Sequence, residues 1–275
     1  MKKLLLILTI ASGMIFNSCD DYLDINDDPN APASDNITTS LIFPAVEMNL
    51  ATVYGNFLRT VGGYYCQHYS QEFSTSNYLD YSQFSMSATR CAGMYDDSYQ
   101  KCLNNIKTIL EKAEADNDWG TYLAATTLRA FVFHYLVDCF GEVPYTEALN
   151  ISITSPVYND GQTIYEGAIA EIDDALAKTS PDAIVCTNYL FPSEKASSWI
   201  QFANALKLRM YTRMAAVSSV DDKIAAIIDE DNLPKADVAF AGCWGPTSGD
   251  MSPFYAEEFA TNWVSTQKNV IANLA

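Results

Sequence analysis

The sequence predicts an all-α protein made of stacked helical hairpins with irregular loops, similar in plan to tetratricopeptide repeats. From about residue 38 onward, apolar side chains recur at three- and four-residue steps, the spacing of a helix with one buried face. The predicted helices have similar lengths and short connections, and no segment has the alternating pattern of a convincing strand. Because no self-similarity with a period of about 34 residues is present, we expect an irregular array and not a regular solenoid.

Residues 1–18 have the composition of a bacterial export signal that ends at a lipoprotein cleavage site. Lys2 and Lys3 precede the apolar run Leu4–Phe16, and Cys19 follows a short polar stretch. This apolar run of about 13 residues is too short to span a bilayer, which takes about 20. We therefore predict cleavage before Cys19 and lipidation of this cysteine, which would anchor the protein to a membrane. The alternative is an ordinary signal peptide followed by an incidental cysteine.

Residues 19–37 are predicted to form an acidic, solvated tether. The segment is rich in aspartate, asparagine and proline and has no helical periodicity. Asp24, Asn26 and Asp28 imitate the start of a calcium-binding loop, but Pro29 occupies the position where that loop requires glycine. We therefore predict no metal site in this segment, and no cofactor anywhere in the chain.

Four long helices are predicted within residues 38–275. The first has its apolar face at Tyr95–Ala113, and the second, Leu123–Cys139, is apolar nearly all round and therefore belongs in the interior. The third, Thr163–Lys178, begins with a capping box, and the fourth covers Lys195–Met214. Glycine and proline beyond the last of these helices indicate a loop with one short helix.

The charge balance excludes nucleic acid as a partner. The chain carries 16 basic and 34 acidic residues, which gives a formal charge of −18. Nucleic-acid affinity comes mainly from Lys and Arg side chains that neutralise phosphates. An anionic membrane surface would repel the protein for the same reason, so we expect membrane association through the lipid anchor alone.

No catalytic residues are predicted. The sequence contains no P-loop, no dinucleotide-binding glycine motif, no His-Glu-x-x-His and no Gly-x-Ser-x-Gly. His134 lies in the all-apolar helix and is expected to be a satisfied core residue, whereas the role of His68 stays open. Pairs of acidic residues suited to glycoside hydrolysis are expected by chance in a chain with 34 of them. The six cysteines after Cys19 permit up to three disulfides, but buried helical positions favour mostly free thiols, and no spacing fits zinc.

The segment between residues 54 and 99 is the candidate ligand-binding region. It holds eight of the 17 tyrosines, interleaved with Ser, Asn and Gln. Tyrosine rings supply contact area at low entropic cost and the short polar groups supply hydrogen bonds, which suits sugars and peptides. Rings with helical spacing, such as Tyr95 and Tyr99, are instead expected to pack between helices. The residues predicted to face a ligand lie in a serine-rich loop without helical spacing, and they are Asn77, Tyr78, Asp80, Tyr81 and Phe84.

One helix and the turn after it resemble the signature region of the SusD/RagB outer-membrane lipoproteins of Bacteroidetes. The matching residues are Leu128-Arg129-Ala130, Tyr135-Leu136, Phe140-Gly141 and Val143-Pro144-Tyr145. Ala130 allows close helix contact, Gly141 can end the helix in a left-handed conformation, and Pro144 prevents its continuation. The aspartates after Cys19 also resemble the surface-export signal of lipoproteins from these bacteria.

The resemblance implies a tetratricopeptide-like fold in a lipoprotein of the outer membrane that faces the cell exterior. It further implies that the protein is not an enzyme. Members bind oligosaccharides, or in some cases peptides, and deliver them to a TonB-dependent, SusC-like barrel. Because such proteins usually continue further, the resemblance implies that residues 38–275 form a truncated SusD-like helical domain. Two other functions stay open, an extracellular glycoside hydrolase and a structural helical adaptor that binds no ligand.

Overall fold

The computed structural model describes residues 37–71, 76–191, 193–240, 243–247, 249–256 and 264–266. The chain divides into two units, Met1–Thr38 and Thr39–Ala275, and the fold described below belongs to the second. The predicted signal peptide, Cys19 and nearly all of the predicted tether lie outside the described residues.

The prediction of an all-α fold is confirmed. The helices, which include the π-helices η3 and η4, are α2 (Thr39–Val53), η3 (Tyr54–Leu58), α3 (Arg59–Tyr65), α4 (Leu79–Ser82), α5 (Ala92–Asp97), η4 (Ser98–Leu103), α6 (Asn104–Ala115), α7 (Trp119–Phe140), α8 (Gly161–Lys178), α9 (Ala196–Met214), α10 (Asp221–Asp229) and α11 (Pro253–Tyr255).

The described residues also contain four short strands, which the apolar spacing did not predict. They form two antiparallel pairs, β1 (Tyr69–Gln71) with β4 (Val264–Thr266) and β2 (Val143–Pro144) with β3 (Tyr158–Asn159). Strands of two or three residues are too short to produce a recognisable alternation of apolar and polar side chains.

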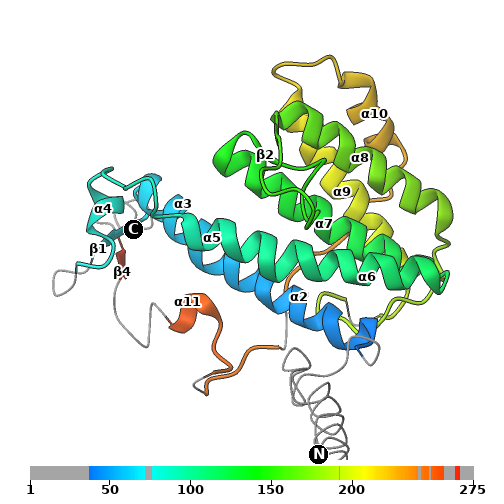
Figure 1. The fold of residues 1–275 in the computed structure, drawn as a ribbon, viewed down its shortest axis with the longest axis horizontal. Coiled ribbons are helices and arrows are strands. Elements are labelled where there is room, and N and C mark those ends of the chain that lie inside the picture. The colour runs from blue at the N-terminus through cyan, green and yellow to red at the C-terminus, as the bar shows by residue number, and fades with distance from the viewer. Residues whose placement is uncertain are drawn as a thin grey trace, which may run out of the picture. The chain divides into compact units, whose positions relative to one another are not determined.

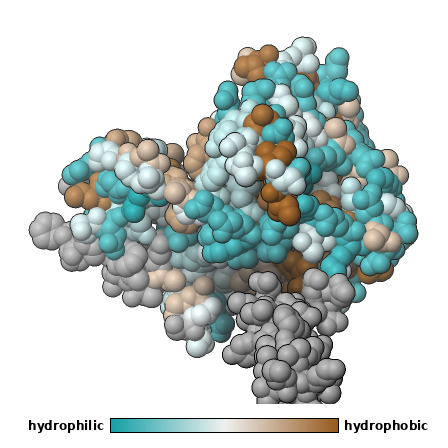
Figure 2. Space-filling model, viewed as in Figure 1, coloured by the Kyte–Doolittle hydropathy of each residue, from teal (hydrophilic) through white to brown (hydrophobic). Residues whose placement is uncertain are grey.

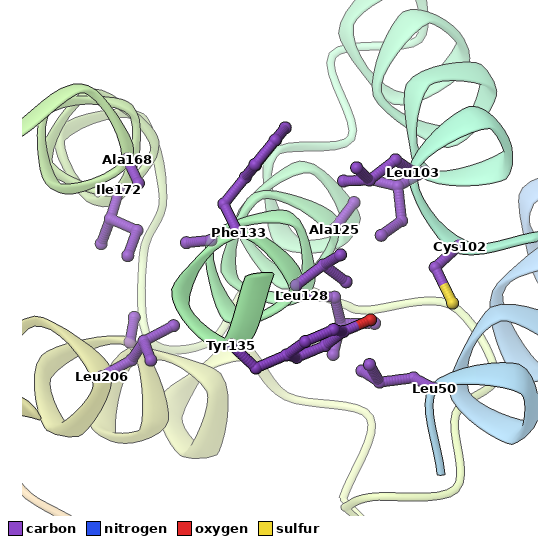
Figure 3. Close-up of a cluster of buried hydrophobic side chains, with 14 of the residues drawn as sticks. Leu50, Cys102, Leu103, Ala125, Leu128, Phe133, Tyr135, Ala168, Ile172 and Leu206 are labelled. Atoms are coloured by element: carbon purple, nitrogen blue, oxygen red, sulfur yellow. The ribbon is translucent and has the colours of Figure 1, made fainter. Parts of the chain in front are cut away.

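The long helices are stacked as hairpins around α7. The first hairpin consists of two helical runs that lie side by side, α2–η3–α3 and α5–η4–α6 (Figure 1). The next helix, α7, packs against α6 on one side and against α8 and α9 on the other. Figure 3 shows this arrangement in the core, where side chains from α2, η4, α8 and α9 surround those of α7.

The central position of α7 follows from its sequence, which is apolar on nearly every face. Its buried residues run from Gly120 to Leu136 with few interruptions, as predicted for an interior helix. Among the described residues, α7 is also the helix whose length and hydropathy would suit a membrane span. Since 67% of that apolar window is buried by the other helices, α7 serves as the core helix of this fold.

The ends of α7 and α8 are fixed by local hydrogen bonds. The side chain of Asp118 accepts a hydrogen bond from the Thr121 backbone N–H at the start of α7, and Gly141 ends that helix with a φ of +75°. The predicted start of α8 at Thr163 was wrong. The N-cap is Asp160, whose side chain accepts from the Thr163 N–H, because a carboxylate here can satisfy a backbone donor of the first turn.

The face seen in Figure 2 is mainly hydrophilic, with isolated hydrophobic patches. One patch lies in the middle of the view, over the segment between α7 and α8. This segment contains Ile151 and Val157, both exposed. Scattered exposed apolar residues are normal on a globular surface.

Candidate functional site

A polar hollow between β1 and α5, referred to below as the loop pocket, is the candidate binding site. It has a volume of about 400 Å³ and is lined by the start of the short helix α4 and by the residues on either side of that helix. Its polar groups are hydroxyls, amides, one carboxylate and one guanidinium, so hydrogen-bond donors and acceptors converge in a small space. The lining residues are Ser76, Asn77, Leu79, Asp80, Gln83, Ser85 and Arg90.

Arg90 joins the parts of the loop pocket to one another. Its Nε lies 2.9 Å from Oδ2 of Asp80, and its Nη2 donates a hydrogen bond of 2.5 Å to the Asn77 carbonyl. The guanidinium also lies 4.8 Å from the centre of the Tyr81 ring, within range of a cation–π interaction. The Arg90 and Asp80 side chains remain 34% and 30% exposed, so this ion pair is partly open to a bound molecule.

Tyrosine rings form a small packed cluster next to the loop pocket, where Tyr81 contacts Arg90. Tyr64, Tyr78 and Tyr81 are all buried, with ring centres 5.5 to 5.9 Å apart. Burial raises the pKa of Tyr81 above its usual value, with the nearby Arg90 acting in the opposite direction. The rings of Tyr78 and Tyr81 therefore pack against protein and offer little surface to a ligand.

Phe84 forms an exposed aromatic platform at the edge of this region. It has a φ of +52°, a left-handed backbone conformation that is costly for a bulky L-residue. Its ring is stacked on Tyr65, with centres 5.1 Å apart and planes 21° from parallel. Because Phe84 is 59% exposed and Tyr65 is 39% exposed, both rings can be reached from solvent.

The structure thus gives the five predicted ligand residues different positions. Asn77 and Asp80 line the loop pocket, Phe84 is exposed nearby, and Tyr78 and Tyr81 lie in the buried cluster. Ligand contact by these five residues stays a prediction.

Gln83 and Arg90 line the same pocket but were not among the predicted ligand residues. One signal was available for Arg90, because it is the single Lys or Arg between residues 60 and 100. A lone cation in an aromatic, acidic segment is expected to have a specific partner.

A second and larger hollow, referred to below as the helical cleft, has a volume of about 930 Å³. Its walls come from α2 and η3, from α7, from α9 and from residues 233–254. Most of the lining is apolar, and its aromatic members are Tyr54, Phe131, Phe202, Phe240, Trp244 and Phe254.

Three charged residues line the helical cleft, namely Arg59, Arg209 and Asp237. The guanidinium of Arg59 lies 4.7 Å from the centre of the Phe254 ring, and its Nε donates to the Gly55 carbonyl. Arg209 is exposed and has no salt bridge with any of the described residues. The residues that line the cleft therefore include two cations and one anion, although the protein as a whole is acidic.

His134 is buried in α7, as predicted, between the rings of Phe131 and Tyr165. The expectation that it is satisfied was wrong, because neither ring nitrogen has a hydrogen-bond partner among the described residues. Oδ2 of Asp138 lies 3.6 Å from Nε2, beyond hydrogen-bond range. Burial lowers the pKa of His134 to about 4, so the ring is neutral near pH 7 and belongs to the core.

The described residues contain no group of three His, Cys, Asp or Glu side chains close enough to hold a metal ion. The calcium-like segment that includes Asp24 and Asp28 lies outside them. The six cysteines after Cys19 are all free thiols, in agreement with the expectation of mostly free thiols. His68 is exposed.

Comparison with protein families gives a match that covers most of the chain. The model of the SusD-like family, described as starch-binding and associating with the outer membrane, matches residues 29–274. A search of curated proteins gives no match.

Several solved structures share the fold. A SusD/RagB family protein from Bacteroides thetaiotaomicron aligns with a TM-score of 0.70 at 19% identity, over 86% of this chain and 52% of that one. A SusD homologue from Bacteroides fragilis gives 0.66 at 18% identity, over 86% and 50%. A chitin-binding protein gives 0.68 at 19% identity, over 86% and 52%. This chain therefore spans about half the length of these structures, and at such identities the likeness concerns the fold alone.

Proposed function

Because this chain belongs to the SusD-like family, whose description is starch-binding in association with the outer membrane, we propose that it captures a nutrient at the cell surface. The nutrient is an oligosaccharide or, as the second possibility, a peptide. In this proposal Cys19 carries the lipid anchor, and the captured molecule passes to a TonB-dependent, SusC-like barrel in the outer membrane. The protein binds its ligand and does not transform it. The family match carries the proposal.

The loop pocket and the Phe84 platform are the proposed ligand site. A sugar ring has hydroxyl groups around its edge and a flatter face of C–H groups, so it calls for hydrogen bonds and for an aromatic surface together. The hydrogen bonds would come from the polar side chains of the loop pocket, which are Asn77, Asp80, Gln83 and Arg90. The aromatic surface would be the exposed ring of Phe84. Tyr78 and Tyr81 belong to the buried cluster next to these groups, and the Tyr81 ring contacts Arg90.

Titration calorimetry with a panel of starch fragments, chitin fragments and short peptides tests this proposal. We expect at least one glycan to bind, and Phe84→Ala to weaken that binding by between about two- and tenfold, because a stacked ring contributes about 0.5–1.5 kcal/mol. Asn77→Ala should also weaken it. The matched control is Tyr189→Ala, which removes an exposed ring that lines neither the loop pocket nor the helical cleft.

The same samples distinguish the other two functions. New reducing ends after incubation with the glycans would support a glycoside hydrolase in place of a binding protein. A wild-type protein that binds no glycan or peptide but co-purifies with a barrel transporter would support the structural adaptor. Equal affinity in Phe84→Ala, Asn77→Ala and wild type would leave binding intact but remove the loop pocket as its location.

A further inference from the structure

We propose that the helical cleft is a second binding site, for an aromatic organic anion such as an aromatic carboxylate. This function differs from the uptake of neutral sugars at the loop pocket. It rests on the volume of the cleft, on the rings in its walls and on its two guanidinium groups.

The size and lining of the cleft suit a small aromatic molecule. Its volume of about 930 Å³ lies within the range of ligand sites, which is about 300–1,000 Å³. Tyr54 and Phe254 are partly exposed in its walls, and Phe131 and Phe202 lie deeper, with ring centres 6.2 Å apart. Rings from η3, α7, α9 and α11 thus converge on one hollow, which suits the binding of an aromatic molecule.

The charges of the cleft favour a negative group on that molecule. The whole chain has a formal charge of −18, yet the cleft has two arginines against the single carboxylate of Asp237. Arg209 forms no ion pair among the described residues, although acidic side chains are abundant. Its guanidinium can therefore bind a carboxylate without first breaking an ion pair with another described residue.

The position of Arg59 links the two kinds of recognition. Its guanidinium lies over the Phe254 ring, and it follows η3, whose wider π-helical turn places Tyr54, Gly55 and Leu58 in the cleft wall. A cation beside aromatic rings fits a molecule whose negative group adjoins an aromatic body. Interrupted helices of this kind often occur at functional sites.

A pair of fluorescent probes tests the proposal. Anilinonaphthalene sulfonate has two aromatic groups and a negative charge, and phenylnaphthylamine has the same skeleton without the sulfonate. We expect the charged probe to bind wild-type protein more tightly than the neutral probe, and naphthoate to displace it. Arg209→Gln should weaken binding of the charged probe about tenfold and leave the neutral probe unchanged, because one charge-assisted contact is lost.

Two further variants complete the test. Lys223→Gln makes the same change in net charge on an exposed residue of α10 that does not line the cleft, and it should bind both probes as wild type does. Arg209→Lys should retain most of the affinity for the charged probe. The proposal is overturned if the two probes bind equally well, if naphthoate does not compete, or if Arg209→Gln behaves like wild type. An equal loss in Lys223→Gln would also overturn it, because the effect would then come from overall charge.

Discussion

At the scale of single residues, the carboxylate of Glu47 is buried in α2 and joins that helix to the loop before α9. Its exposed fraction is 0%, and its two oxygens accept hydrogen bonds from the backbone N–H groups of Tyr189 and Leu190, at 2.6 and 3.4 Å. Burial raises the pKa of Glu47 to about 7, although the two N–H donors act in the opposite direction. The carboxyl group therefore changes its charge near neutral pH inside the protein.

This raised pKa predicts how stability depends on pH. Between about pH 4.5 and 7 the folded protein keeps the Glu47 proton that the unfolded chain has released, so the contribution of Glu47 is greatest below pH 4.5 and is lost as pH rises through 7. Urea unfolding should therefore be measured for wild type and Glu47→Gln between pH 4.5 and 7. As pH rises, the free energy of unfolding of wild type should fall relative to that of the variant, by at most about 1.4 kcal/mol per pH unit. A difference that is constant with pH would contradict the prediction.

His134 changes stability with pH in the opposite direction to Glu47. Comparing wild type with Glu47→Gln removes this contribution of His134. Because its pKa is lowered to about 4, the folded protein binds fewer protons there than the unfolded chain, so its contribution to stability increases from about pH 4 to 6.5. The pH profile of wild type alone would mix the two effects. Since both proteins contain His134, their difference isolates Glu47.

The candidate site was predictable in part at this scale. Composition and the absence of helical spacing singled out a segment from which Asn77 and Asp80 line the loop pocket. The expectation of a loop was wrong at Asp80, which lies in the short helix α4, because four helical residues are too few to show a helical period. Composition and spacing could not show that Tyr78 and Tyr81 are buried, because their partner Tyr64 lies on another element. Periodicity detects burial along one helix face, whereas packing between a loop and the end of a distant helix leaves no period in the sequence.

At the scale of elements, the first turn of α7 depends on a glycine. A Cβ atom at Gly120 would lie 2.0 Å from the backbone carbonyl oxygen of Ile184, which cannot move aside as a flexible side chain could. Helix propensity alone would make Gly120→Ala stabilising by up to about 1 kcal/mol. We expect the clash to dominate and the variant to be destabilised by about 1–3 kcal/mol in urea unfolding.

Gly62→Ala is the matched control for this prediction. Gly62 lies within α3, is exposed, and has no atom within 4 Å of the position that a Cβ would occupy. The same change of residue should therefore be neutral or slightly stabilising there. Similar effects of the two substitutions would show that close packing against Ile184 does not control the start of α7.

The long helices were predictable from sequence, and their details were not. The apolar faces of α6, α7, α8 and α9 each repeat over several turns, so their periodicity is strong. The π-helical turns at Tyr54–Leu58 and Ser98–Leu103 span five and six residues, which is too short for a different period to show in the sequence. The start of α8 was misplaced because Asp160 and Thr163 both have side chains that can cap a helix. The hydrogen bond from the Thr163 N–H to the Asp160 side chain shows that Asp160 is the N-cap.

At the scale of the whole molecule, charge and membrane attachment have to be considered together. A protein with a formal charge of −18 is repelled by an anionic bilayer, so electrostatic attraction cannot hold it there. Among the described residues, α7 is the helix with the length and hydropathy of a membrane span, but it is mostly buried and forms the core of the fold. We therefore propose that a covalent lipid holds the protein at the outer membrane, and Cys19 is the candidate for its attachment.

Metabolic labelling with radioactive palmitate tests this anchor. We expect the wild-type chain to incorporate label and to sediment with membranes, because several acyl chains at one end outweigh the repulsion by bilayer charge. Cys19→Ala should lose both properties. The matched control is Cys66→Ala, which removes an exposed free thiol of the folded domain and should be labelled like wild type. If Cys19→Ala were labelled as strongly as wild type, or if wild type were unlabelled, the protein would need another means of attachment, and a secreted binding protein would become the better explanation.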